Sequence, residues 1–223
     1  MNLVYYESQS SQKPDLIDTT SSKKVVYLRK DITTTEVPVD DSENAETTTM
    51  YTYKEAKLTK EEYETYKLEL QMDNTIDLER CTLDELKSYW KEKINEQCTE
   101  AIAAGVDVET TQGTEHFSLT FADQINIAGI MITLDSGDIA GHPYHADGKT
   151  CRFFSKEELV KISAAATQYK VYNTTVCNHI HAWINRCESK EEVEAISFTS
   201  TLPDDLAQSL QAIVASTQTT TNN

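Results

Sequence analysis

The sequence predicts an α+β protein with a small antiparallel β region at the N-terminus, connecting helices, and a mainly α-helical C-terminal domain with one β-hairpin. Three observations predict this class. Residues 24–53 are rich in β-branched and aromatic side chains, which favour strands. Residues 82–104 and 173–187 repeat apolar side chains every three or four positions, the spacing of one helical face. Residues 106–119 alternate polar and apolar side chains on both sides of a turn at Gly113, as a hairpin does.

These patterns divide the 223 residues into four parts, each with its own expected role. They are a β-rich docking region (1–55), a helical connector (56–104), a mainly helical C-terminal domain (105–216) and a polar tail (217–223). No internal repeat of fixed period is found, so the parts are not copies of one unit.

The charge balance excludes several classes of partner. The chain has 37 acidic and 20 basic residues, and its formal net charge is −17. Such a chain repels phosphate backbones and anionic lipid surfaces, so we expect neither nucleic acid nor a membrane as a partner.

The first residues lack the basic start and apolar core of a signal peptide. We therefore expect the protein to be made in the cytoplasm, with its five cysteines reduced.

The first 55 residues favour a sheet. Residues 1–22 hold one expected strand, and the rest of that stretch is expected to be extended or mobile unless a partner orders it. Residues 40–46 are polar and are typical of a loop or hairpin tip. The expected strands are 3–6, 24–29, 36–39 and 47–53. Because so small a sheet holds little core, we expect it to pack on another element or another chain.

Four capping boxes predict where helices begin. Thr59, Thr82, Ser155 and Ser189 are each followed by Glu three residues later, which pairs a hydroxyl with the free amides of the first turn. The expected helices are 59–73, 82–104 (ended by Gly105), 120–135, 155–169, 173–187, 189–196 and one from Pro203 to about 215, with residues 139–150 as a loop. The helix from residue 120 carries its apolar side chains at Phe121, Ile125, Ile127, Ala128 and Ile132.

The helix expected over 173–187 is predicted to be the centre of the C-terminal domain. Asn173 or Thr174 is its expected N-cap, and Trp183 gives its apolar face a large area to bury. The helix expected over 82–104 carries a narrow apolar stripe that includes Trp90. That stripe packs either on its own domain or on the same helix of another copy, and the pattern leaves both open.

Two groups of side chains are candidates for a metal site or a catalytic site. Cys177, His179, His181 and Cys187 are zinc-ligand or thiol types, but only Cys177 and His181 share a helical face, and that face is the predicted core. His142, His145 and Asp147 lie in the expected loop. They could form a metal or acid–base site, or they could hydrogen-bond the backbone of a structural loop. We favour the structural interpretation of both groups, so the sequence predicts no catalytic, cofactor or metal residues.

Aromatic residues are the candidates for protein contacts. Tyr51, Tyr53, Tyr63 and Tyr66 cluster around the start of the first helix, and Trp90 lies on the next one. Tyr and Trp are favoured at protein interfaces. The alternative is that these tyrosines fill a small core, and the sequence does not decide between the two.

The order of several motifs over residues 94–213 resembles a family of domains of unknown function found in tail-module proteins of bacteriophages and prophages, related to tail-fibre assembly proteins. The motifs are Ala101–Val108, Gly113–Leu119, Asp123–Ile127, Pro143–Gly148, Cys151–Phe154 and Cys177–Arg186. The segments Val26–Arg29, Tyr51–Glu55 and Leu58–Tyr63 are similar to the leading region of such proteins.

The resemblance implies a non-enzymatic structural component of a phage tail or baseplate, located in the virion and made in the host cytoplasm. Its expected partners are other tail or baseplate proteins and further copies of itself in a symmetric assembly. No family catalytic residues or cofactors carry over. The first alternative is a tail-fibre assembly chaperone that is absent from the mature virion. The second is a cryptic metal- or thiol-dependent protein that uses Cys177, His181 or the His142–His145 segment.

Overall fold

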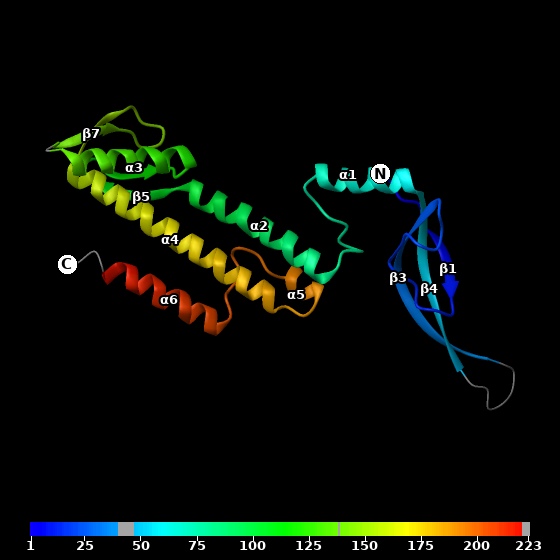
Figure 1. The fold of residues 1–223 in the computed structure, drawn as a ribbon. Coiled ribbons are helices and arrows are strands. Elements are labelled where there is room, and N and C mark those ends of the chain that lie inside the picture. Colours follow the sequence, from blue (N-terminus) through cyan, green and yellow to red (C-terminus); the bar gives the residue numbers. More distant parts are fainter. Residues whose placement is uncertain (40–46, 138, 220–223) are drawn as a thin grey trace. The chain divides into compact units, whose positions relative to one another are not determined.

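The computed structural model describes residues 1–39, 47–137 and 139–219, with side chains described as far as Ser216 (Figure 1). The expected hairpin tip at 40–46 lies outside the described residues. The chain forms two compact units, Met1–Tyr89 and Trp90–Asn223. The boundary between them falls inside the connector expected over 56–104, within helix α2 (Leu83–Ala104).

The first unit is built on a four-stranded antiparallel sheet. Its order is β1-β4-β3-β2, with β1 (Tyr6–Ser10), β2 (Ile17–Asp18), β3 (Val25–Pro38) and β4 (Thr47–Thr59). The sheet confirms the predicted antiparallel β region. The two strands expected at 24–29 and 36–39 are one long strand, with a register shift between Lys30 and Thr33. Of the two states expected for the first 22 residues, extended or mobile, the structure shows the extended one at β1 and β2, which pair with the sheet. The strand expected at 3–6 begins only at Tyr6.

Helix α1 (Lys60–Met72) packs against this sheet. Thr59 forms the predicted capping box with Glu62. The core of the unit consists of alternate residues on the two central strands, Val26 and Leu28 with Ala56 and Leu58. Tyr63 and Tyr66 of α1 pack against these side chains.

The second unit contains most of the helices. They are the later part of α2, α3 (Phe121–Ser136), α4 (Lys156–Arg186), α5 (Lys190–Glu194) and α6 (Asp204–Thr219). Two expected helices, 155–169 and 173–187, are one continuous helix, α4. Asn173 is buried inside it and donates from Nδ2 to the carbonyl of Tyr169 (2.9 Å), so its amide bonds within the helix instead of capping a new one. Helix α6 also continues through residues 217–219, where the polar tail was expected.

Two short hairpins complete the second unit. The predicted one pairs β5 (Val106–Thr110) with β6 (Gly113–Phe117). Gly105 ends α2 with φ 91°, and a Cβ there would clash with the carbonyl oxygen of Phe117. The second hairpin pairs β7 (Gly141–Tyr144) with β8 (Arg152–Ser155). The expectation of a simple loop over 139–150 was therefore wrong at its start, because β7 carries Tyr144 into the core.

The core of the second unit lies where α3, α4 and the hairpins meet. The ring of Phe117 lies 6.3 Å from Tyr144 and 5.9 Å from Phe154, measured between ring centroids. Ile127, Ile130, Leu134, Leu159 and Ile162 complete this cluster from α3 and α4. The predicted α+β class is confirmed, with two hairpins instead of one.

Helix α4 has buried residues along almost its whole length, from Glu158 to Ile184, which agrees with the prediction of a central helix. Four side-chain contacts join it to α2 within the second unit. The stripe on α2, from Trp90 onward, therefore packs on its own unit, as one of the two interpretations predicts. Trp183, however, is only partly buried. Within the described residues, no helix is long and apolar enough to cross a membrane.

Candidate functional site

In the Cys177 group, Cys177 and His181 of α4 contact α2, whereas His179 and Cys187 bond carbonyl oxygens of α4 itself. The Cys177 thiol donates to Asn95 Oδ1 (3.4 Å) and lies 3.7 Å from His181 Nε2. His179 Nδ1 instead lies 2.8 Å from the carbonyl oxygen of Thr175. Burial, together with the neighbouring Cys98, raises the pKa of Cys177 to about 12. A thiol with so high a pKa is protonated at neutral pH and is a poor nucleophile.

The His142–Asp147 segment bonds backbone, as the structural interpretation expects. Asp147 accepts from the amide of Ser118 (3.2 Å) and from its hydroxyl, and its own amide donates to the carbonyl of His116 (2.8 Å). His142 Nδ1 lies 2.7 Å from the carbonyl of Pro143. Within the described residues, no group of three or more His, Cys, Asp or Glu side chains is arranged to hold a metal ion.

His116 belongs to a cluster that the sequence did not indicate. Its Nδ1 lies 2.7 Å from Asp107 Oδ1, and its Nε2 lies 2.7 Å from the carbonyl oxygen of Ala104. Both partners are acceptors, so the imidazolium with two N–H groups fits best, and the hydrogen bond to Asp107 raises the pKa of His116. No ring nitrogen is left to accept a proton from nearby Ser118. A serine, a histidine and an aspartate therefore lie together without the arrangement of a hydrolase triad.

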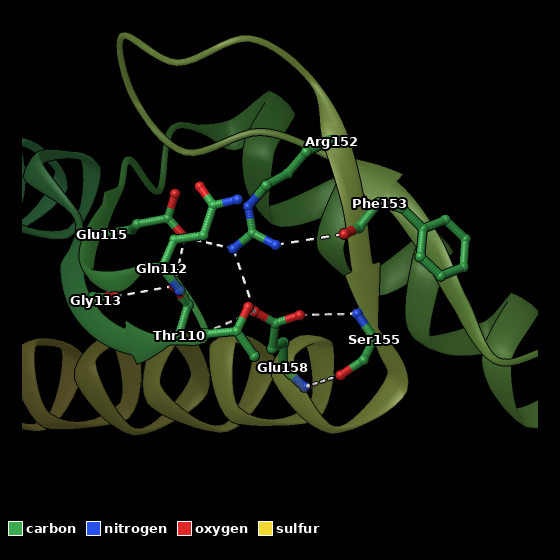
Figure 2. Close-up of polar contacts among 9 residues, drawn as sticks. Thr110, Gln112, Gly113, Glu115, Arg152, Phe153, Ser155 and Glu158 are labelled. Atoms are coloured by element: carbon green, nitrogen blue, oxygen red, sulfur yellow. Dashed lines mark hydrogen bonds and ion pairs between the residues drawn. The ribbon is translucent and has the colours of Figure 1, made fainter.

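A buried polar cluster is centred on Arg152 of β8 (Figure 2). Its Nη2 donates to Glu115 Oε2 of β6 (2.6 Å) and Glu158 Oε1 of α4 (3.2 Å), and both carboxylates are buried. Glu158 Oε1 also accepts from the amide (3.0 Å) and hydroxyl (2.8 Å) of Thr111. The Arg152 guanidinium carbon lies 3.5 Å from the centroid of the Phe154 ring. These contacts join the two hairpins to the start of α4.

The cluster holds its carboxylates ionised. Burial alone would raise the pKa of Glu158, but hydrogen bonds from Ser155, Thr111 and Arg152 outweigh burial and lower that pKa to about 2. The pKa of Glu115 is also lowered, because its bonds to Arg152 and Thr110 outweigh its burial. General acid–base catalysis at neutral pH needs a group that titrates near that pH. These two carboxylates do not, so the cluster fits a structural role.

The first unit contains two comparable arginines. Arg29 donates from Nε to Glu55 Oε2 (2.8 Å) and from Nη2 to Asp18 Oδ2 (3.3 Å). Arg80 is buried and donates from Nη1 to Asp77 Oδ2 (2.8 Å) and from Nη2 to the hydroxyl of Tyr5. Both clusters join strands or segments that are distant in sequence. Sequence reasoning missed them because nothing local distinguishes these arginines from exposed ones.

The candidate interaction residues belong to both units, the four tyrosines to the first and Trp90 to the second. Tyr53 is buried under the Arg29 guanidinium, and Tyr66 packs on the sheet core and donates its hydroxyl to Asp77 (2.8 Å). Trp90 belongs to the second unit, where its Nε1 donates to the carbonyl of Ile196 (2.8 Å). Tyr51 and Tyr63 are half-buried. Tyr63 also packs on the sheet core, so for Tyr53, Tyr63 and Tyr66 these contacts correspond to the core interpretation. A role of Tyr51 and Trp90 in protein contacts stays a prediction.

A different surface of the first unit is open. The outer parts of β3 and β4 pair with each other, Thr33–Pro38 with Thr47–Thr52, and we call this pair the β ribbon (Figure 1). β1 reaches β4 only as far as Tyr51, and β2 reaches β3 only at Tyr27 and Leu28. Among the described residues, both outer edges of the ribbon therefore lack a strand partner from Thr33 to Pro38 and from Thr47 to Met50.

Comparison with known proteins gives one family match, which covers most of the second unit. The model of one protein family, described as a domain of unknown function (DUF4376), matches residues 85–200. The chain belongs to this family. The DUF4376 match starts in α2 and ends before α6, so it covers the Arg152 and His116 clusters but not the β ribbon. It is shorter at its C-terminal end than the resemblance expected over 94–213. No curated protein and no solved structure matches the chain.

Proposed function

We propose that the protein is a non-enzymatic structural component of a bacteriophage tail or baseplate, and that it docks on a neighbouring tail protein through the β ribbon. The observation that carries the docking is the pair of open edges on this ribbon. The assignment to a phage tail rests on the motif order over 94–213, which resembles tail-module proteins.

The ribbon is well suited to accept a strand from another chain. An unpaired strand edge presents a row of backbone donors and acceptors, and proteins usually block such edges with charges or prolines. Here the two edges read Thr-Thr-Thr-Glu-Val-Pro (33–38) and Thr-Thr-Thr-Met (47–50), so Glu36 and Pro38 are their only blocking residues. A two-stranded ribbon is marginal alone in water. A strand added by a partner would supply the missing hydrogen bonds.

The charged clusters support a structural role. The carboxylates and guanidiniums of the Arg29, Arg80 and Arg152 clusters pair with groups inside their own unit. Such pairs fix the positions of strands and helices in both units. A rigid unit with an open docking edge is what a repeated part of a symmetric assembly needs.

The first experiment measures the protein in purified phage particles by quantitative mass spectrometry against the major tail protein. We expect a fixed ratio to that protein. Absence from the particle, with abundance in the infected cell, would contradict the proposal and favour the assembly chaperone.

A second experiment tests the ribbon with a matched pair of variants, Thr34→Pro and Thr35→Pro. Successive amides of a strand point to opposite sides, so one variant removes an N–H at the open edge and the other removes a ladder bond to β4. Hydrogen exchange identifies the variant that keeps β3–β4 pairing. That variant should fold, but its ratio to the major tail protein in purified particles should be lower by about tenfold or more. Unchanged incorporation of that variant would rule out docking through this edge.

A further inference from the structure

His116 joins three segments of the second unit through its ring and its backbone. One ring nitrogen lies 2.7 Å from the carboxylate of Asp107, its partner in the β5–β6 register. The other lies 2.7 Å from the carbonyl oxygen of Ala104, the last residue of α2. The backbone carbonyl of His116 accepts from the amide of Asp147 (2.8 Å), in the turn between β7 and β8. The residue therefore connects the end of α2, the hairpin and this turn.

Two backbone amides report on the junction between α2 and the hairpin. The amide of Leu119, just after β6, donates to the carbonyl of Ala103 in α2 (3.2 Å). The amide of Gly105 donates to the carbonyl of Ile102 in the last turn of α2 (3.1 Å). Both bonds weaken if the end of α2 moves away from the hairpin.

The two oxygens around the His116 ring require two ring donors. A neutral imidazole has one N–H, so one of the oxygens would then face a nitrogen lone pair at 2.7 Å. Two acceptors at that distance repel each other, so this contact must lengthen. The remaining N–H bonds the ionised carboxylate of Asp107 more strongly than a neutral carbonyl, because hydrogen bonds to charged groups are the stronger ones. Loss of the proton therefore releases the Ala104 carbonyl.

Charged groups of the neighbouring segments favour the protonated ring. The hydrogen bond to Asp107 raises the pKa of His116, and the charge of Asp147 adds to this rise. The carbonyl end of a helix, here that of α2, also favours a cation. Hydrogen bonds from Ser118 lower the pKa of Asp147, and the charges of His116 and His145 lower it further. The titratable groups of this cluster are thus two carboxylates and two imidazoles.

We propose that His116 is a proton-dependent contact, which holds the end of α2 on the β5–β6 hairpin when its ring is charged and loosens this junction when its ring is neutral. The raised pKa gives the direction of the response. The contribution to stability is complete below the unfolded pKa of about 6.5 and is lost as pH rises through the higher folded value. The junction should therefore be tight in mildly acidic solution and looser in alkaline solution. The response needs no partner, so it is independent of the proposed function.

A nuclear magnetic resonance titration of the full chain tests the ring. The midpoint of His116 should lie above the ordinary value of about 6.5. Asp107→Asn removes the carboxylate and should lower this midpoint, because the second donor then bonds a neutral amide. A wild-type midpoint at or below about 6.5 would overturn the proposal. So would a midpoint that Asp107→Asn leaves unchanged.

Hydrogen exchange tests the junction. After correction for the intrinsic pH dependence of exchange, the amides of Gly105 and Leu119 should lose protection roughly three- to tenfold as pH rises through the His116 midpoint.

A matched pair of variants separates this response from other titrations. His116→Gln removes the titrating ring and should make the protection of the two amides independent of pH over the same range. The control is His142→Gln, because the His142 ring contacts the carbonyl of the adjacent Pro143 (2.7 Å) and lies outside the junction. This control should keep the wild-type response. Equal pH responses in the wild type and in His116→Gln would overturn the proposal.

Discussion

The two units bury their apolar and charged side chains in different proportions. In Met1–Tyr89, the sheet core is a small cluster of Val26, Leu28, Ala56 and Leu58, and buried charge surrounds it in the Arg29 and Arg80 clusters. In Trp90–Asn223, a larger apolar cluster spans both hairpins and two helices, and the Arg152 cluster lies where the hairpins meet α4. Because buried ion pairs contribute little net stability and the apolar cluster of the first unit is the smaller, we expect the first unit to have the lower free energy of unfolding. The same unit carries the β ribbon.

The largest expected loss is in the apolar core of the second unit. Phe154 is fully buried and its ring contacts Phe117, Tyr144 and the Arg152 guanidinium. Phe154→Ala should lower the free energy of unfolding of this unit by about 3–5 kcal/mol. Its neighbour Phe153 is 60% exposed, so Phe153→Ala should cost less than about 0.5 kcal/mol. Urea unfolding measures both, and equal losses would contradict the assignment of Phe154 to the core.

The next largest effect tests the charged core of the first unit. Asp77→Ala removes the closer and more buried of the two carboxylates that pair with the buried Arg80 guanidinium and leaves only half-exposed Glu79 (3.3 Å), which should cost about 3 kcal/mol. Hydrogen exchange should show the loss in peptides of residues 1–89. Glu64 pairs with Lys67 at an exposed position, so Glu64→Ala should cost at most about 1 kcal/mol. If the two variants behave alike, the Asp77–Arg80 pair does not support this unit.

Trp183→Ala tests the choice of α4 as the central helix. A fully buried tryptophan would cost about 3–5 kcal/mol on truncation, but this ring is partly exposed. We expect about 1–3 kcal/mol, measured by urea unfolding of the second unit. A loss below about 0.5 kcal/mol, as at surface sites, would show that the Trp183 end of the helix contributes little.

The last prediction is a pH dependence at the Arg152 cluster. The pKa of Glu158 is about 2 in the folded chain and near 4.5 when unfolded. Its ionised form therefore stabilises the second unit above about pH 4.5, and this contribution is lost as pH falls toward 2. Glu158→Gln should be less stable at neutral pH and should lose stability less steeply over that range. Parallel stability curves for both proteins would show that Glu158 does not titrate as the structure indicates.

Local patterns predicted most helix starts. The hydroxyls of Thr59, Thr82, Ser155 and Ser189 each bond the amide three residues later, because a capping box needs only neighbouring residues. The same local reasoning failed at Asn173. An Asn that favours a cap in isolation can bond an internal carbonyl when packing continues the helix on both sides.

The candidate surfaces were only partly visible in the sequence. Strand character at 47–53 and the apolar residues of α3 were predicted, but not which edges and faces stay uncovered. Ile125 and Ile127 look alike in the sequence, and only the packing of α3 on α4 and β7 decides that Ile127 is buried and Ile125 exposed.

By itself, the amino-acid sequence determined the α+β class, most helix starts and the β5–β6 hairpin, because periodicity, capping and turn chemistry act over a few residues. The tertiary structure alone decided the pairing of β1 and β2, the Arg80 and Arg152 clusters, and the open edges of the β ribbon. Each of these features depends on residues that are far apart in the sequence. Local patterns carry no information about which distant residues contact one another in the folded protein.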